Sequence, residues 1–300
     1  MSASSLLRAE IDAQGPIPFS RFMEVALYDP AYGYYRKDHF GIHGDFYTAE
    51  QLQPTFGLLL RRFCDQQGIT HIVQPGAGRA GLAPSFDGLR YTPIDLHYGA
   101  WPASFSGLVL AHEFFDALPV NVAECQGGVW HALRVTHDGS RFRWRLAEPI
   151  APPQRSLPEE IERIEIPVGL PKELERIARH LTTGSLLVLD YGYSDRERLR
   201  FPQGSLLSYR RHQVQDDVLR DPGEQDITAH VPFTTLREAA HSYGFQTVLD
   251  ESMGSFLLRV GEEDQFASVL SEAEPSRRLQ LKTLLFDIGE SFRAVLLKRS

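Results

Sequence analysis

Three glycines follow an apolar segment in the first third of the chain. Residues 70–74 form this segment, and Gly76, Gly78 and Gly81 lie in the turn that comes after it. Glycines allow such a turn to adopt positive φ angles, and they let a ligand lie against bare backbone. The spacing fits a dinucleotide-binding turn and also the glycine frame of a phosphate loop. Leu82 stands where a phosphate loop needs its lysine, which favours the first interpretation.

An acidic residue follows the next apolar segment. Residues 90–94 are a candidate strand, and Asp95 comes directly after it. It lies roughly 20 residues beyond the first glycine, a spacing at which an acid can accept hydrogen bonds from ribose hydroxyls. The pattern therefore predicts a nucleoside-type ligand, with an ordinary structural turn as the alternative.

A second group of polar residues follows a short apolar strand at residues 106–111. His112, Glu113 and Asp116 come at its carboxyl end, and ligands bind at this edge in open α/β sheets. His112 and Glu113 fit the start of a zinc-binding His-Glu-x-x-His helix, but Asp116 replaces the second histidine, so we expect no metal. The alternative role of the two acids is to cap a helix N-terminus.

The elements that must position these residues alternate between helical and extended patterns. Only a few residues separate Leu82 from Arg90, so the first crossover helix should be reduced to a turn or two. Residues 204–233 are rich in charged groups without periodicity, which is typical of a functional loop. A hairpin is predicted around an Asp-Gly turn at residues 137–140. Apolar spacing predicts helices over residues 19–27, 56–63, 171–181, 234–243 and 275–287, and strands over 184–193, 245–249 and 291–298.

The composition is that of an ordinary globular protein, with 42% hydrophobic and 23% charged residues. The net charge of −8 disfavours nucleic acid as a partner and favours a basic protein. We expect no membrane insertion, because no segment approaches the length of a membrane span. The two cysteines are too few for a disulfide framework, which favours a reducing compartment. The expected location is the cytoplasm.

Several stretches resemble the MidA-type S-adenosylmethionine-dependent methyltransferases, whose mitochondrial members assist assembly of respiratory complex I. The resemblance covers nearly the whole chain. The last of the matching stretches, Asp-Pro-Gly-Glu-Gln-Asp-Ile-Thr-Ala-His-Val at 221–231, is long and unusual in composition. The stretches are residues 15–19, 27–35, 44–49, 113–119, 189–193 and 221–231.

The resemblance implies an α/β fold with the seven-stranded, Rossmann-like sheet of class I methyltransferases. It implies a single domain over residues 1–300, in which an N-terminal helical and loop segment (1–68) covers a core (69–300). A long insertion at about 194–232 lies in the C-terminal half of the chain.

The resemblance also implies S-adenosylmethionine as the cofactor and a protein arginine as the methyl acceptor. Carboxylates hold a guanidinium group by paired, charge-assisted hydrogen bonds and can orient one of its nitrogens. The candidate partner is a subunit of a respiratory complex, and a homodimer is the candidate assembly. The acids expected to be catalytic are Glu113, Asp116, Glu224 and Asp226. The residues expected to bind the cofactor are Gly44, Asp45, Gln74, Gly76, Gly78, Asp95 and His112.

Three positions depart from the family pattern on the cofactor side. Gln74 stands where an acid is usual, Ala80 replaces a third glycine, and His112 replaces an asparagine. The alternative function is therefore that of a catalytically inactive family member that binds a protein or assists assembly.

Overall fold

The computed structural model describes residues 1–36, 49, 52–153, 157–210, 213–215, 217–270 and 275–300. The chain divides into two compact units, each assembled from three separate stretches. The first unit comprises Met1–Phe46, Ala117–Lys172 and Tyr193–His230. The second unit comprises Tyr47–Asp116, Glu173–Gly192 and Val231–Ser300.

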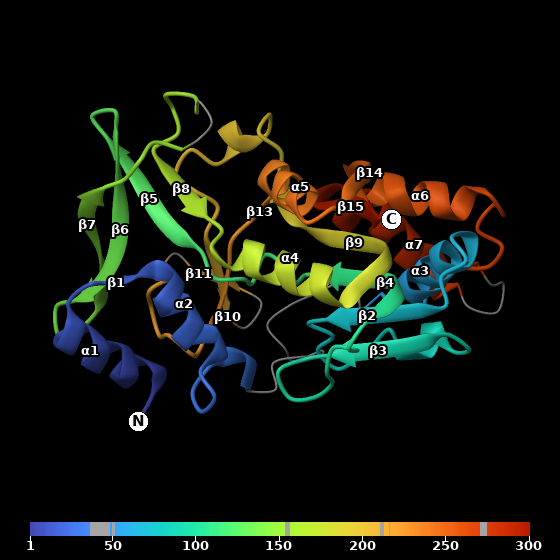
Figure 1. Ribbon diagram of the computed structural model, residues 1–300, viewed down its shortest axis with the longest axis horizontal. Helices are drawn as coiled ribbons and strands as arrows, with labels where there is room; N and C mark the ends of the chain where they lie inside the picture. The colour runs from blue at the N-terminus through green and yellow to red at the C-terminus, as the bar shows by residue number, and fades with distance from the viewer. Residues whose placement is uncertain (37–48, 50–51, 154–156, 211–212, 216, 271–274) are drawn as a thin grey trace. The chain divides into compact units, whose positions relative to one another are not determined.

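The second unit is built on a sheet with the strand order β14-β15-β9-β4-β2-β3 (Figure 1). The strand β2 pairs in parallel with β3 and β4, and β4 pairs in parallel with β9. In contrast, β15 runs antiparallel to both β9 and β14. The short strand β13 (Val231–Pro232) pairs with β9 as the seventh member, which confirms the predicted Rossmann-like sheet. The other strands are β2 (His71–Pro75), β3 (Arg90–Ile94), β4 (Phe105–His112), β9 (Leu181–Tyr193), β14 (Gln246–Ser252) and β15 (Phe292–Arg299).

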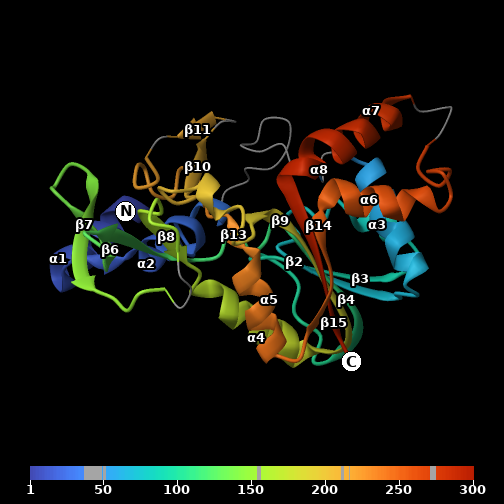
Figure 2. The same cartoon turned by 90° about the horizontal axis from the view of Figure 1, so that it is seen from above.

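Helices cover both faces of this sheet (Figure 2). One layer contains α3 (Thr55–Gln66), α6 (Met253–Glu262) and α7 (Ser276–Lys282), and the other contains α4 (Gly169–His180) and α5 (Phe233–Ser242). Apolar residues at helical spacing, such as Phe56 and Leu60 of α3, are buried in one core with Leu108 and Leu187 of the sheet. The predicted helices are thus confirmed, except that the last one changes to a π-helix (Thr283–Asp287) before α8 (Ile288–Ser291).

The crossover from β2 to β3 is unusually short. It contains only a 3-10 helix, η3 (Ala83–Phe86), as the sequence predicts. Phe86 is buried, and its ring centre lies 5.2 Å from that of Tyr91 on β3. This contact fixes the crossover against the sheet without a full helix.

The first unit contains an antiparallel sheet of five strands, in the order β1-β6-β5-β8 with β7 paired to β6. The helices α1 (Ala3–Gln14) and α2 (Phe19–Tyr28) share an apolar core with this sheet. The predicted hairpin is confirmed, because β6 and β7 flank Gly139, which has a φ of 88°. The strands are β1 (Ile17–Pro18), β5 (Asn121–Gln126), β6 (Val129–His137), β7 (Phe142–Pro149) and β8 (Arg163–Ile166).

The stretch 204–233 is not the aperiodic loop that the sequence predicts. It supplies a small sheet of β10 (Leu207–Arg210), β11 (Gln213–Gln215) and β12 (Asp226–Thr228). Each of these strands is too short to show a clear alternation of apolar and polar residues, which is why the prediction was wrong.

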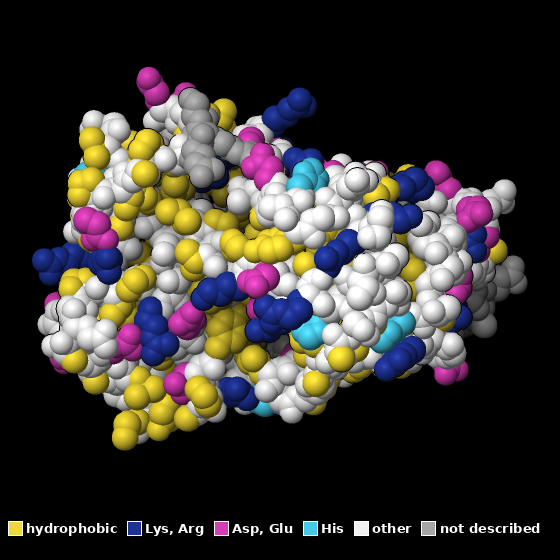
Figure 3. All heavy atoms as spheres, in the orientation of Figure 1, with side chains coloured by type: hydrophobic (Ala, Val, Ile, Leu, Met, Phe, Trp, Pro, Cys, Tyr) yellow, Lys and Arg dark blue, Asp and Glu magenta, His cyan; other side chains and the backbone are white. Residues whose placement is uncertain are grey.

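Charged groups of both signs are distributed over the surface. On the face shown in Figure 3, basic and acidic side chains of the described residues are interspersed.

Candidate functional site

The glycine turn follows directly from β2 in the second unit. Gly76 has a φ of 67° and Gly78 a φ of 53°, so both adopt the left-handed conformation that glycine favours. Ala80 also has a positive φ, of 54°. The alanine that replaces the family's third glycine therefore adopts a conformation that costs an L-residue about 1–2 kcal/mol.

Asp95 lies against this turn. Its Oδ2 accepts a hydrogen bond from the Gly78 N–H at 2.8 Å. Tyr98 donates from its hydroxyl to the Gly78 carbonyl oxygen at 2.7 Å, and the Ala77 N–H donates to the Ile94 carbonyl at 3.1 Å. The turn after β2 and the loop after β3 are thus joined by hydrogen bonds, and the Asp95 carboxylate lies beside the glycines.

The segment after β4 adjoins the same turn. A Cβ atom added at Gly76 would lie 2.9 Å from Cδ2 of Phe114, so the Phe114 ring packs directly against this glycine. Phe114 is not among the residues predicted from the sequence, because an aromatic residue after a strand gives no signal of which turn it covers. The contact brings residues 112–116 beside the glycine turn.

His112 is buried at the end of β4. Its ring centre lies 5.1 Å from that of Phe56 and 6.0 Å from that of Phe292, the latter stacked at 18°. Its Nε2 is 3.3 Å from Oε1 of the neighbouring Glu113. The ring therefore packs between aromatic side chains while its nitrogen faces a candidate catalytic acid.

Glu113 has a φ of 47°, which is rare for a residue with a side chain. Asp190, at the carboxyl end of β9, lies next to it and is fully buried. Its Oδ2 accepts hydrogen bonds from the N–H groups of Phe114 (3.1 Å) and Phe115 (2.8 Å). Burial raises the pKa of Asp190, while these hydrogen bonds and the nearby His112 lower it in part. The sequence shows only that Asp190 ends a strand.

Gln74 and Asp116 complete the predicted residues of the second unit. Both side chains are buried. The Gln74 Oε1 accepts a hydrogen bond from the Tyr91 hydroxyl at 2.7 Å. The structure thus brings Gln74, Gly76, Gly78, Asp95, His112, Glu113 and Asp116 to the region where β2, β3 and β4 end.

Two further predicted acids belong to the first unit. Of these, Glu224 is exposed and Asp226 is buried. The Asp226 Oδ1 accepts hydrogen bonds from the Tyr35 hydroxyl and the Ile227 N–H, both at 2.8 Å. Gly44 and Asp45 lie outside the described residues.

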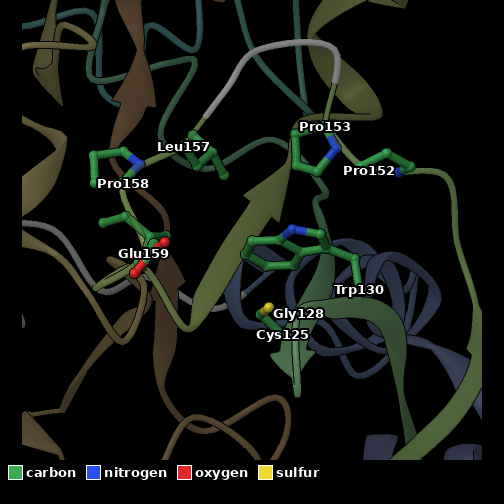
Figure 4. Close-up of a pocket in the computed structure, with 9 residues that line it drawn as sticks. Cys125, Gly128, Trp130, Pro152, Pro153, Leu157, Pro158 and Glu159 are labelled. Carbon is green, nitrogen blue, oxygen red and sulfur yellow. The ribbon is translucent and has the colours of Figure 1, made fainter.

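The first unit has a pocket of its own, with a volume of about 470 Å³. Figure 4 shows Trp130 at its wall, with Pro152 and Pro153 on one side and Cys125 on the other. None of the predicted site residues that the structure describes lines this pocket.

Neither a metal site nor a membrane span is found in the described part of the chain. Its His, Cys, Asp and Glu residues form no cluster that could hold a metal ion. Its helices are all too short or too polar to cross a membrane.

A family model of S-adenosyl-L-methionine-dependent methyltransferases matches residues 84–249. The chain belongs to this family. It is a methyltransferase that uses S-adenosylmethionine, and the comparisons with known proteins do not favour the inactive alternative.

The methyltransferase is similar along most of its length to curated proteins. A Drosophila melanogaster protein named "Protein arginine methyltransferase NDUFAF7 homolog, mitochondrial" is 28% identical, over 92% of this chain and 79% of its own. The Danio rerio protein arginine methyltransferase NDUFAF7 is 27% identical, over 92% of this chain and 80% of its own. The Homo sapiens protein arginine methyltransferase NDUFAF7 is 26% identical, over 92% of this chain and 77% of its own.

Two solved structures from Burkholderia thailandensis share the fold of the methyltransferase. One contains S-adenosylhomocysteine, has a TM-score of 0.88 and is 27% identical, with 99% of this chain and 92% of the other covered. The second, a native structure, has a TM-score of 0.85 and is also 27% identical, with 99% of this chain and 91% of the other covered.

The names of the relatives correct one expectation. The Drosophila, Danio and human proteins are all named as mitochondrial. The cytoplasmic location predicted from the small number of cysteines is therefore wrong. A reducing environment and a low cysteine count do not distinguish one intracellular compartment from another.

The residues at the glycine turn fit the cofactor. Gly76 is exposed and Gly78 half-buried, both at positive φ, and the Asp95 carboxylate beside them is a group that can accept hydrogen bonds from ribose hydroxyls. One of the predicted cofactor-binding residues fits less well. Gln74 has an amide side chain at a position where the family usually has a carboxylate.

Proposed function

We propose that this methyltransferase transfers the methyl group to an arginine side chain of a protein. The observation that carries the proposal is the contact of Phe114 with Gly76. Through it, the segment with Glu113 and Asp116 lies beside the turn that fits the cofactor. The curated relatives, which are named protein arginine methyltransferases, support the same acceptor.

We assign the cofactor contacts to the glycine turn and the loop after β3. The backbone of Gly76 and Gly78 would lie against the adenosine part, and Asp95 would accept hydrogen bonds from the ribose. Gln74 and His112, together with Gly44 and Asp45 outside the described residues, complete the proposed set. When bound, S-adenosylmethionine supplies an electrophilic methyl carbon on a sulfonium sulfur.

Glu113 and Asp116 would hold the acceptor. A guanidinium group donates paired hydrogen bonds to carboxylates, which fixes the direction in which its nitrogens point. The guanidinium nitrogen loses one proton when it gains the methyl group, and a carboxylate in contact with it can accept that proton. For Glu224 and Asp226 we likewise propose a catalytic role.

The proposal also covers the protein substrate and the oligomeric state of the enzyme. A subunit of a respiratory complex is the proposed substrate, on the strength of the family resemblance. We also propose that residues 1–300 act as one functional domain and that the active form is a homodimer. Sedimentation analysis of the purified protein tests the assembly.

The test of the activity uses S-adenosylmethionine with a tritiated methyl group and solubilised mitochondrial protein as the probe. We expect label in methylarginine after acid hydrolysis, and Glu113→Gln should lower its rate by at least about tenfold, the scale of one charge-assisted hydrogen bond. Glu262→Gln, which changes an exposed acid on α6, is the matched control and should transfer at the parent rate. Label only in lysine or histidine would contradict the acceptor, and no label in any protein would contradict the transfer.

A further inference from the structure

We infer that Asp190 is a positioning residue for methyl transfer, because its carboxylate holds the backbone of Phe114 and Phe115 in place. The inference rests on the proposed function, in which Glu113 and Asp116 hold the acceptor. In this inference, a residue of β9 orients Glu113 and Asp116, the acids that follow β4.

The segment after β4 has little regular structure to hold it. The pairing of β4 with β9 ends at His112 and Leu189, and residues 113–115 belong to neither a helix nor a strand. The Glu113 N–H donates to the Leu189 carbonyl at 3.0 Å. The next two N–H groups, of Phe114 and Phe115, donate to the same oxygen of Asp190. Three consecutive N–H groups are thus bound by the end of β9.

The two oxygens of Asp190 have separate partners. Oδ2 receives the two bonds from Phe114 and Phe115, and Oδ1 receives the N–H of Tyr191 at 3.0 Å. The carboxylate is fully buried, so water does not compete for these bonds. Hydrogen bonds to a charged acceptor are about twice as strong as neutral ones, and a buried donor left without a partner is costly.

The conformation of Glu113 explains why the segment needs such a clamp. A left-handed φ costs an L-residue free energy, so it persists only where neighbouring contacts determine it. Here the hydrogen bond to Leu189 fixes Glu113 itself and the bond to Asp190 fixes Phe114. Without Asp190, we expect Glu113 to relax toward negative φ, which would turn its side chain away from its present direction.

Two substitutions of Asp190 distinguish the effect of losing its hydrogen-bond acceptors from the effect of losing its negative charge. Asp190→Ala removes every acceptor. Asp190→Asn keeps one amide oxygen, which can take the place of Oδ2 and accept from both Phe114 and Phe115. Its NH2 group then replaces Oδ1, so the bond from the Tyr191 N–H is lost. Glu165→Ala is the matched control, since Glu165 is also a buried carboxylate that accepts a backbone N–H, from Ser205 at 2.8 Å, but lies in the first unit.

The first measurement is amide hydrogen exchange, which needs no substrate. We expect Asp190→Ala to speed exchange at Phe114 and Phe115 by at least tenfold, Asp190→Asn to preserve most of the protection, and Glu165→Ala to leave these two amides unchanged. Calorimetry with S-adenosylhomocysteine should give affinities within about threefold of the parent for all three variants. Unchanged exchange at Phe114 and Phe115 in Asp190→Ala would overturn the inference.

The second measurement is the tritium transfer assay, run well below the melting temperature of each variant. Asp190→Ala should lower kcat about 10- to 100-fold with little change in KM for S-adenosylmethionine, the effect of one or two lost charge-assisted hydrogen bonds. Asp190→Asn should recover most of this loss. An equal loss of kcat in Glu165→Ala at matched stability would reduce Asp190 to a general structural role and overturn the inference.

The two proposals fail in different ways. If the parent protein labels no arginine, the proposed function fails, and the inference built on it fails with it. If the parent labels arginine and Asp190→Ala does so at the same rate, only the inference fails.

Discussion

Asp95 and Gly78 are joined by a hydrogen bond, in which the Asp95 Oδ2 accepts from the Gly78 N–H at 2.8 Å. The Asp95 Oδ1 accepts from the Leu96 N–H at 2.7 Å. A carboxylate offers about four acceptor sites. Asp95 can therefore shape the turn and still accept hydrogen bonds from a ribose, so a change at this residue affects both tasks.

Asp95→Ala should weaken binding of S-adenosylhomocysteine by at least about tenfold, since it removes the acceptors of the ribose and of the Gly78 N–H. Asp95→Asn keeps one acceptor oxygen and should lose less. The measurement is calorimetric titration. The control is Asp87→Ala, which changes an exposed acid in the crossover between β2 and β3 and should bind as the parent does. Equal affinities of parent and Asp95→Ala would contradict the role of Asp95.

Ala80→Gly should stabilise the protein. The left-handed φ of 54° costs alanine about 1–2 kcal/mol, whereas the greater freedom of an unfolded glycine costs about 0.5–1 kcal/mol. The strain is the larger of the two, so we expect a net gain of about 0.5–1 kcal/mol in the free energy of unfolding, measured with urea. Ala83→Gly at the start of η3 lacks a positive φ and should instead destabilise. A loss of stability in Ala80→Gly would mean that the alanine methyl group makes contacts worth more than the strain.

Gly78→Val should lower both cofactor binding and stability. Valine is branched at Cβ and strongly disfavours the φ of 53° that Gly78 adopts, at a cost of about 1–2 kcal/mol. Calorimetry and thermal melting report the two effects separately. Gly81→Ala is the matched control, because Gly81 in the same turn has no positive φ. A valine variant that binds S-adenosylhomocysteine normally would show that the turn does not contact the ligand.

His230 should make the stability depend on pH below neutrality. Burial lowers the pKa of His230 to about 4, while an unfolded histidine has a pKa of about 6.5. Between these values the unfolded chain binds a proton that the folded chain does not. Stability therefore falls as the pH decreases from about 6.5 to about 4, by at most about 1.4 kcal/mol per pH unit from this residue.

The measurement is urea unfolding of the parent and of His230→Gln at pH 7, 6, 5 and 4. Carboxylates titrate in both proteins, so the difference between the two curves isolates the histidine. The glutamine variant should lose less stability on acidification. Parallel curves would show that His230 is accessible to protons in the folded state.

Sequence patterns were sufficient to predict the long strands of the second unit, whereas its seven-stranded sheet was implied by the family resemblance. Long apolar strands and glycines at a fixed distance from Asp95 are local signals, and the structure confirms that they lie together. The bond from Phe114 to Asp190 joins residues 76 positions apart. A local sequence pattern does not reveal a hydrogen bond between residues so far apart in the chain. The role of Asp190 could therefore not be predicted. The strands of the small sheet at β10–β12 were missed for a different reason, because three or four residues are too few to reveal a period.

The placement of β15 has a consequence for how the protein is made. The first unit has all of its strands once residue 230 has been synthesised. The sheet of the second unit must wait for residues 292–299, because β15 lies between β9 and β14 and pairs with both. During that interval the nascent chain presents two unpaired strand edges, which are templates for pairing with other chains. Ribosome-bound intermediates of this protein should therefore be most dependent on chaperones while residues 231–299 are being translated.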